Sequence, residues 1–63
     1  MQDSRLNDLR KKGTHVTVFM INGVKLTGKI HGFDPFVIIL DSEENGQRLL
    51  YKHAVSTLIP EDR

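Results

Sequence analysis

The change in hydrophobic period after Gly13 is the feature that most constrains how this 63-residue chain can fold. From Thr14 onward the run THVTVFMI alternates between apolar and polar residues and is rich in β-branched side chains. An Asn-Gly pair follows at 22–23, and a second stands at 45–46. Asn-Gly between alternating segments is a strong signal for a two-residue hairpin turn. Most of the chain is therefore predicted to form antiparallel β-hairpins.

Five short strands are expected, at 14–21, 24–33, 36–40, 49–51 and 54–59. Gly28 and Gly32 interrupt the second strand, and glycines inside a strand often mark a bend or bulge. Asp34-Pro35 predicts a turn, because proline fixes φ and aspartate caps its own backbone. The run FVIIL at 36–40 is apolar on both faces and is expected to be deeply buried. These features predict a mainly β, five-stranded, strongly bent open barrel.

The first hairpin makes a prediction about side-chain neighbours. A two-residue turn at 22–23 would pair Phe19 with Leu26 and Ile21 with Val24, with all four side chains on one side. An aromatic and aliphatic cluster would then lie near the hairpin tip. Such a cluster is either part of the core or a platform for a flat ligand.

Residues 1–13 are expected to form one helix. Gly13 can end it in a left-handed conformation, and Leu6 and Leu9 share one face while their surroundings are polar. So narrow an apolar stripe predicts a lid on top of the barrel. The chain is thus expected to be a single domain, with the helix at 1–13, the barrel at 14–60 and a short tail at 61–63.

Small size predicts association. A core of this length rarely supplies more than roughly 3–5 kcal/mol. The chain has no cysteine for disulfides or thiolate ligands, and His15, His31 and His53 lack the spacing of a zinc site. An open barrel also leaves two edge strands, and the segment at 54–59 has neither lysine nor internal proline to block pairing. Head-to-tail pairing of edges gives a ring or a filament.

Composition excludes several classes of function. The net charge is +1, and no apolar run has the length of a membrane span or resembles an export leader. We therefore expect a soluble, cytoplasmic chain without membrane partners. No nucleophile with a base, paired carboxylates or phosphate-binding glycine loop is evident, so neither an enzyme nor a metal or other cofactor is expected. The pair Lys52-His53 suits either a solvated turn or an anion site.

Longer motifs resolve this choice by resemblance. NGVKLTGKIHGFDPFVIIL followed by YKHAVST resembles the Hfq family of bacterial Sm-like RNA chaperones, in order and spacing. The likeness includes Gln2-Asp3 and the LND at 6–8, and covers nearly the whole chain apart from a slightly longer DSEENGQ hairpin. It implies an Sm-like (SH3-like or OB-like) barrel with one N-terminal helix. It also implies a homohexameric ring, formed by pairing the fourth strand of one subunit with the fifth of the next.

The resemblance also implies three RNA-binding surfaces and a subunit interface. U-rich RNA would bind at a proximal pore, made of Gln2, Phe36, Lys52 and His53. A-rich RNA would bind a distal face, made of Phe19, Asn22, Gly23, Val24, Lys25, Leu26 and Thr27. A basic rim would catch single strands through Asn7, Arg10, Lys11, Lys12 and Phe33. The subunit interface would include Tyr51, Val55, Ser56 and Thr57.

Some positions depart from the family pattern. Pro35 stands where an amide side chain is common in the pore, and Thr27 and Arg48 stand where some members read adenine with glutamines. Gly13 replaces a residue that is often charged, which predicts a weaker rim. The expected partners are small regulatory RNAs and mRNAs, weakly DNA, and copies of the chain itself. The competing hypothesis is an SH3-like module that binds a protein and not RNA.

Overall fold

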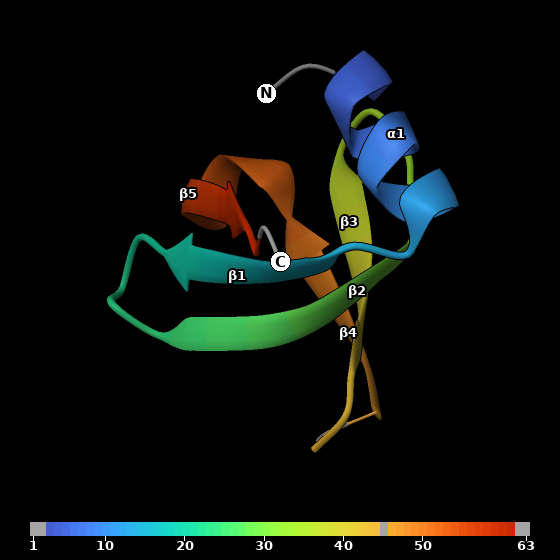
Figure 1. Cartoon of the computed structure of the whole chain (residues 1–63). Helices are drawn as coiled ribbons and strands as arrows, with labels where there is room; N and C mark the ends of the chain where they lie inside the picture. The colour runs from blue at the N-terminus through green and yellow to red at the C-terminus, as the bar shows by residue number, and fades with distance from the viewer. Residues whose placement is uncertain (1–2, 45, 62–63) are drawn as a thin grey trace.

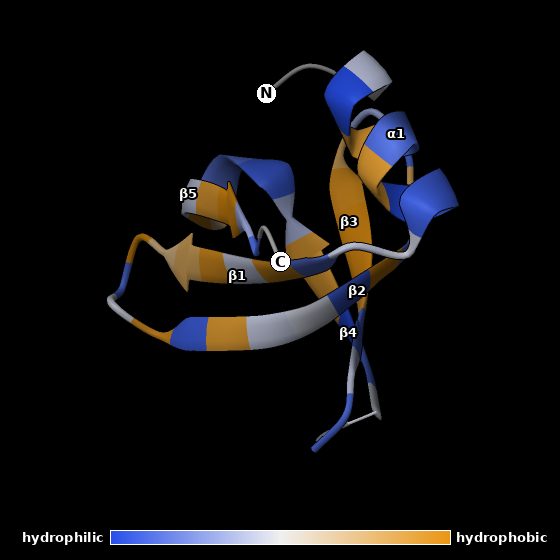
Figure 2. Cartoon of the chain, viewed as in Figure 1, coloured by the Kyte–Doolittle hydropathy of each residue, from blue (hydrophilic) through white to orange (hydrophobic). Residues whose placement is uncertain are grey.

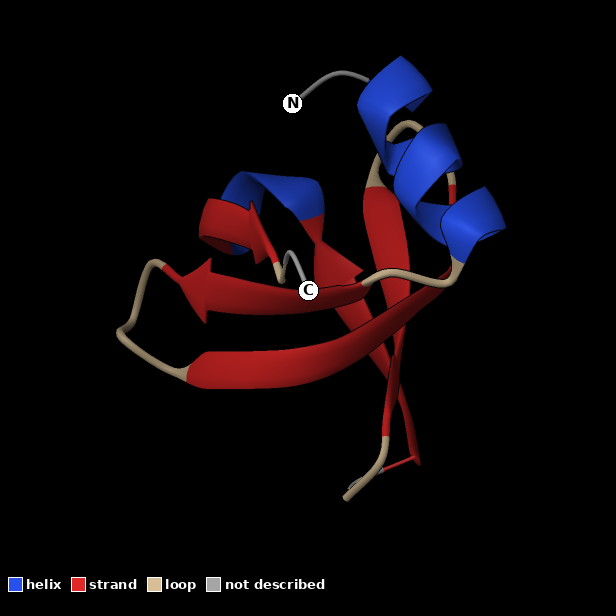
Figure 3. Ribbon diagram, viewed as in Figure 1, coloured by secondary structure: helices blue, strands red, loops and turns tan. Residues whose placement is uncertain are grey.

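The computed structural model describes residues 3–44 and 46–61. One helix precedes five strands, as the sequence predicts (Figure 1). A short 3-10 helix, η1, separates the last two strands (Figure 3). The elements are α1 (Asp3–Lys12), β1 (His15–Met20), β2 (Lys25–Phe33), β3 (Val37–Ser42), β4 (Gly46–Tyr51), η1 (Lys52–Ala54) and β5 (Val55–Pro60).

Helix α1 ends at a glycine, as predicted. Gly13 has a φ of 63°, in the left-handed region that glycine enters at low cost. Its amide donates to the Arg10 carbonyl and the Thr14 amide donates to the Leu9 carbonyl, both at 3.2 Å. These two bonds form a Schellman motif, which satisfies carbonyls left open at the helix end.

All five strands form one antiparallel sheet in the order β4-β3-β2-β1-β5. Strands β4 and β5 are therefore its two edges. The long strand β2 bends where the register shifts between Ile30 and Gly32, which confirms the bend or bulge expected at Gly32. Gly28 serves a different purpose, because a Cβ there would lie 2.5 Å from the Asp41 carbonyl oxygen. A side chain at Gly28 would prevent the close approach of β2 and β3.

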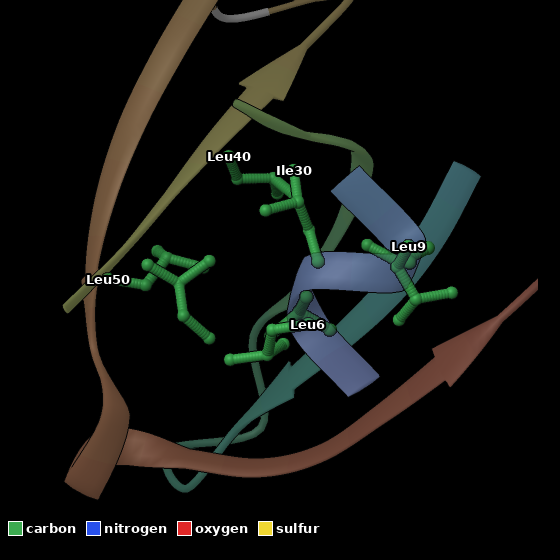
Figure 4. Packing of buried hydrophobic residues seen from close by; sticks show 8 residues of the cluster. Leu6, Leu9, Ile30, Leu40 and Leu50 are labelled. Carbon is green, nitrogen blue, oxygen red and sulfur yellow. The ribbon is translucent and has the colours of Figure 1, made fainter. Parts of the chain in front are cut away.

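The core lies between α1 and the inner face of the sheet, with the helix as the predicted lid (Figure 4). Leu6 and Leu9 are only 1% and 8% exposed, while the rest of α1 is hydrophilic (Figure 2). Burial of such side chains supplies most of the folding free energy. The buried cluster consists of Leu6, Leu9, Val16, Val18, Ile30, Ile38, Leu40 and Leu50.

Two sequence predictions about the strands were wrong. The run at 36–40 is not buried on both faces: Ile38 and Leu40 are buried, Val37 and Ile39 are half-buried, and Phe36 is 74% exposed. Only one face of β3 meets the helix-covered core. The fourth strand is also longer than 49–51 and begins at Gly46. Its polar start pairs with β3 in a hairpin that projects away from α1 (Figure 1), where backbone pairing does not require apolar side chains.

Candidate nucleic-acid interface

The turn between β2 and β3 is organised by Asp34, as expected for a turn-forming aspartate. Its Oδ1 accepts hydrogen bonds from the amides of Phe36 and Val37, both at 2.8 Å, and its own amide donates to the Val37 carbonyl. The bonds from Phe36 and Val37 lower the pKa of the Asp34 carboxyl below its ordinary value, and the positive charge of Lys52 acts in the same direction. The turn presents the Phe36 side chain to solvent.

This turn is joined to η1 through the backbone. The Lys52 amide donates to the Phe36 carbonyl at 2.8 Å, immediately beyond the pairing of Val37 with Tyr51. Two segments that are distant in sequence therefore meet at one end of the β3–β4 pair. The meeting brings three of the four predicted pore residues together: Phe36, Lys52 and His53. The fourth, Gln2, lies outside the described residues.

Each basic side chain of η1 lies against an aromatic ring. The Lys52 ammonium is 5.5 Å from the centroid of the Phe33 ring, within range for a cation–π contact. The His53 and Tyr51 rings have centroids 5.6 Å apart and are tilted by 31°. Phe33, which the resemblance assigned to the rim, thus contacts a pore residue. The resulting surface offers a fixed cation, an imidazole and exposed aromatic rings.

The β1–β2 hairpin corrects the predicted register by one residue. The Met20 amide donates to the Val24 carbonyl at 2.8 Å, and the Gly23 amide donates to the Met20 carbonyl at 3.0 Å. Gly23 has a φ of 89°, so the loop is a turn followed by a left-handed residue and contains Ile21, Asn22 and Gly23. The prediction of a two-residue loop was wrong.

The register decides which distal residues share a face. Phe19 pairs with Lys25, whereas Leu26 pairs with the buried Val18. Because neighbouring strand residues point to opposite faces, Phe19 and Leu26 lie on opposite sides of the sheet within one chain. Leu26 packs against the core, and Phe19 lies on the outer face with Lys25 and Thr27. The single-sided cluster predicted from the hairpin is therefore not formed.

The tip of this hairpin is nevertheless apolar and exposed. Ile21 is 69% exposed and Val24 47%, values that are high for large hydrophobic side chains. Asn22 shapes the tip, because its Oδ1 accepts a bond from the Val24 amide at 3.1 Å. Asn22, Gly23, Lys25 and Thr27 are all exposed. The predicted distal residues thus remain together at one end of the molecule, with Leu26 turned inward.

The predicted rim residues other than Phe33 lie on α1. Arg10 and Asn7 are joined by a hydrogen bond of 2.7 Å from the guanidinium Nη2 to the amide oxygen. Lys11 and Lys12 are exposed in the last turn, where cations interact favourably with the helix dipole. The same cations can therefore stabilise the end of the helix and bind RNA.

The predicted interface residues lie along the two edge strands. Tyr51 ends β4 and is 56% exposed, while Val55, Ser56 and Thr57 begin β5. Large apolar side chains on these strands also face outward, with Leu49 58% and Ile59 49% exposed. Exposed apolar edges of this kind favour pairing with another chain.

Two features of the surface were not predicted. His15 Nε2 and Glu43 Oε1 are 3.2 Å apart, which links the start of β1 to the β3–β4 turn. Arg5, assigned to no surface, lines a groove that also contains Lys52.

Within residues 3–44 and 46–61, no group of three or more His, Cys, Asp or Glu could hold a metal ion. In the same part of the chain, no helix combines the length and apolarity needed to cross a bilayer.

Comparison with known proteins decides the family. A model of the family described as Hfq protein matches residues 1–63. The chain belongs to the Hfq family. This confirms the resemblance drawn from the YKHAVST and NGVKLTGKIHGF motifs.

Named relatives and solved structures agree with this assignment to the Hfq family. The RNA-binding protein Hfq of Bacillus subtilis is 51% identical over 61 residues, which span 97% of this chain and 82% of that protein. The RNA-binding protein Hfq of a Geobacillus species is 54% identical over 61 residues, spanning 97% of this chain and 81% of that protein.

Among solved structures, a crystal structure of the pleiotropic translational regulator Hfq matches with a TM-score of 0.87 at 41% identity. The match covers 92% of this chain and 95% of that one. An Hfq protein from Anabaena sp. shares the fold, with a TM-score of 0.82 at 24% identity and 92% of each chain covered. The Sm-like fold expected from the sequence is therefore confirmed.

Proposed function

We propose that this Hfq-family chain is an RNA chaperone that makes and breaks no covalent bond. It closes into a homohexameric ring and binds U-rich single strands at the pore and A-rich strands on the distal face. By holding both, it promotes the pairing of small regulatory RNAs with mRNAs. The relatives named above as RNA-binding proteins support the class of ligand.

The observation that carries this proposal is the junction of Lys52 with Phe36. The backbone bond of 2.8 Å joins a residue that carries a cation to Phe36, which is 74% exposed. Lysine offers rotatable donors to phosphate or to a base carbonyl, and an exposed ring offers a stacking surface. An aromatic ring left this open on a small domain is consistent with a ligand that has both charge and a flat face.

Assembly follows from the two unpaired edges. Strands β4 and β5 are different surfaces, so pairing β4 of one copy with β5 of the next is head-to-tail and gives a ring where the rotation closes. Around such a ring the Lys52 and His53 side chains repeat. Their mutual repulsion falls when a polyanion enters, so a subunit of net charge +1 can still form a strongly attractive pore.

The chaperone mechanism would be one of proximity. Binding two RNAs to separate faces of one ring raises the effective concentration of each near the other. Cations on α1 would lower the repulsion between approaching strands. Affinity should fall with salt, with log K declining by about 0.7 for each phosphate neutralised on a single strand.

The decisive experiment compares two ligands on the same variants. Lys52→Ala or His53→Ala should weaken oligo-U binding by about tenfold or more and leave oligo-A binding unchanged. Phe19→Ala should do the reverse, because stacking contributes about 1–3 kcal/mol per base. Fluorescence anisotropy with both oligomers measures these effects, and native mass spectrometry checks that each variant keeps its assembly. Equal weakening of both ligands by both substitutions would contradict the two-face proposal.

A further inference from the structure

A groove runs between α1 and the start of β5. Its lining includes the buried leucines Leu6 and Leu9, together with two cations and two hydroxyl side chains. The groove is lined by Arg5, Leu6, Leu9, Lys52, Val55, Ser56, Thr57 and Leu58. Lys52 belongs to the proposed pore site, so the groove continues that site towards the helix.

Arg5 lies on a different flank of α1 from the rim residues Arg10 and Asn7. The rim residue Lys12 shares the flank of Arg5 but is about two turns further along the helix and does not line the groove. Successive helix residues are rotated by about 100°, so Arg5 is about 40° from Leu9 and Arg10 is about 40° from Leu6. The two buried leucines lie between them, which puts Arg5 and Arg10 on opposite flanks. The bond between Arg10 and Asn7 marks the rim flank. Arg5 shares the groove with Lys52, whereas none of the four rim residues on α1 lines it.

The electrostatics of the groove favour an anion. None of its lining residues is acidic, although two of them are cations. Among the described side chains no carboxylate forms an ion pair with Arg5, which is exposed. A second groove, beside His15, shows the opposite character, because Glu43, Glu44 and Glu61 line it. A polyanion is thus attracted to one groove and repelled by the other.

We propose that Arg5 is an RNA-binding residue that extends the Lys52 site. A phosphate of the single strand lies between the Arg5 guanidinium and the Lys52 ammonium. Guanidinium groups pair with phosphate oxygens through two parallel hydrogen bonds, which favours arginine at this position. This inference rests on the proposed function, since it assumes that Lys52 contacts RNA.

The test is the affinity for oligo-U, measured by fluorescence anisotropy across a range of salt concentrations. Arg5→Gln should weaken binding by about two- to fivefold for each subunit that the RNA engages. It should also reduce the slope of log K against log salt by about 0.7 for each phosphate that Arg5 neutralises in the parent protein. Arg5→Lys should restore most of the salt slope, because it keeps the charge. The matched control is Lys29→Gln, which removes one exposed charge from β2, outside the groove.

Every outcome separates this inference from the function on which it rests. If Arg5→Gln and Lys29→Gln have equal effects while Lys52→Met weakens oligo-U binding, Arg5 has no role and the pore proposal stands. If Lys52→Met has no effect, the pore proposal itself fails. Native mass spectrometry tests a role of Arg5 in assembly, because Val55, Ser56 and Thr57 of the groove also belong to the proposed subunit interface. A fall in assembly mass for Arg5→Gln would place Arg5 in that interface and would overturn the assignment.

Discussion

The ammonium of Lys52 lies over the ring of Phe33, 5.5 Å from its centroid, and so links the end of β2 to η1. Lysine has a long, flexible side chain, and holding it costs conformational entropy. A ring beneath the ammonium supplies part of that ordering before RNA arrives. Phe33 also packs against the core, so its position is fixed by the fold.

The first prediction concerns this contact. Phe33→Leu keeps an apolar side chain but removes the π face, and should weaken oligo-U binding by about two- to fivefold, in line with about 0.5–1 kcal/mol for an exposed cation–π pair. Phe33→Tyr should bind like the parent protein. In a Lys52→Met background the Phe33→Leu change should have no further effect. Additive effects in this double-mutant cycle, measured by anisotropy, would contradict the contact.

The second prediction concerns the close approach of β2 and β3. Gly28→Ala should lower the free energy of unfolding by about 1–3 kcal/mol, because its Cβ would lie 2.5 Å from the Asp41 carbonyl oxygen and the backbone would have to shift. Urea denaturation at fixed protein concentration measures the decrease. Gly32→Ala is the matched control in the same strand, since a Cβ there meets nothing within 4 Å. Equal decreases for the two variants would mean that replacing any glycine in this strand lowers stability to the same extent. The close approach at Gly28 would then contribute nothing of its own.

The third prediction is a pH dependence of the Asp34 turn. Hydrogen bonds from Phe36 and Val37 lower the pKa of Asp34 in the folded state below its ordinary 3.8. The carboxylate therefore stabilises the fold at neutral pH, and this contribution is lost as pH falls through the folded-state pKa. Asp34→Ala should lower the melting temperature at pH 7, and the difference from the parent should shrink below about pH 4.

Asp34→Asn is the control for this effect, because it keeps an acceptor oxygen but cannot titrate. At pH 7 its melting temperature should lie between those of the parent and Asp34→Ala, and its difference from the parent should vanish as the parent carboxyl is protonated. Thermal melts followed by circular dichroism between pH 7 and about pH 2.5 would test both variants. A parent–alanine difference that stays constant over this range would show that the charge of the carboxylate is irrelevant to the turn.

Local chemistry explains which parts of the fold could be predicted. Gly13 alone predicts where α1 ends, and Leu6 and Leu9 predict which face it buries. The Asp34 turn is predictable because an aspartate side chain can accept hydrogen bonds from backbone amides two and three residues later. The loop after β1 could not be read the same way. Asn22-Gly23 is compatible with loops of two or three residues, since both contain glycine at positive φ. The choice depends on packing Leu26 beside Val18, which is a tertiary effect.

The candidate site shows the same limit. Family motifs identified Lys52, His53 and Phe36, and the fold brings them together. No motif indicated that Phe33 would lie beneath Lys52, or that Arg5 would share a groove with it, because these neighbours come from three separate elements. The polar start of β4 was missed because Gln47 and Arg48 carry no apolar alternation, although their backbones pair with β3.

The fourth prediction tests the corrected hairpin. Gly23 has a φ of 89°, and a Cβ there would meet nothing within 4 Å, so a substitution acts only through backbone conformation. Gly23→Ala should therefore lower the free energy of unfolding by about 1–2 kcal/mol. Gly23→Asn should cost less, because asparagine tolerates the left-handed region. Urea titrations at one protein concentration compare the two, since assembly makes stability depend on concentration. If alanine is tolerated as well as asparagine, Gly23 does not need its left-handed conformation. The three-residue loop that pairs Phe19 with Lys25 would then be wrong.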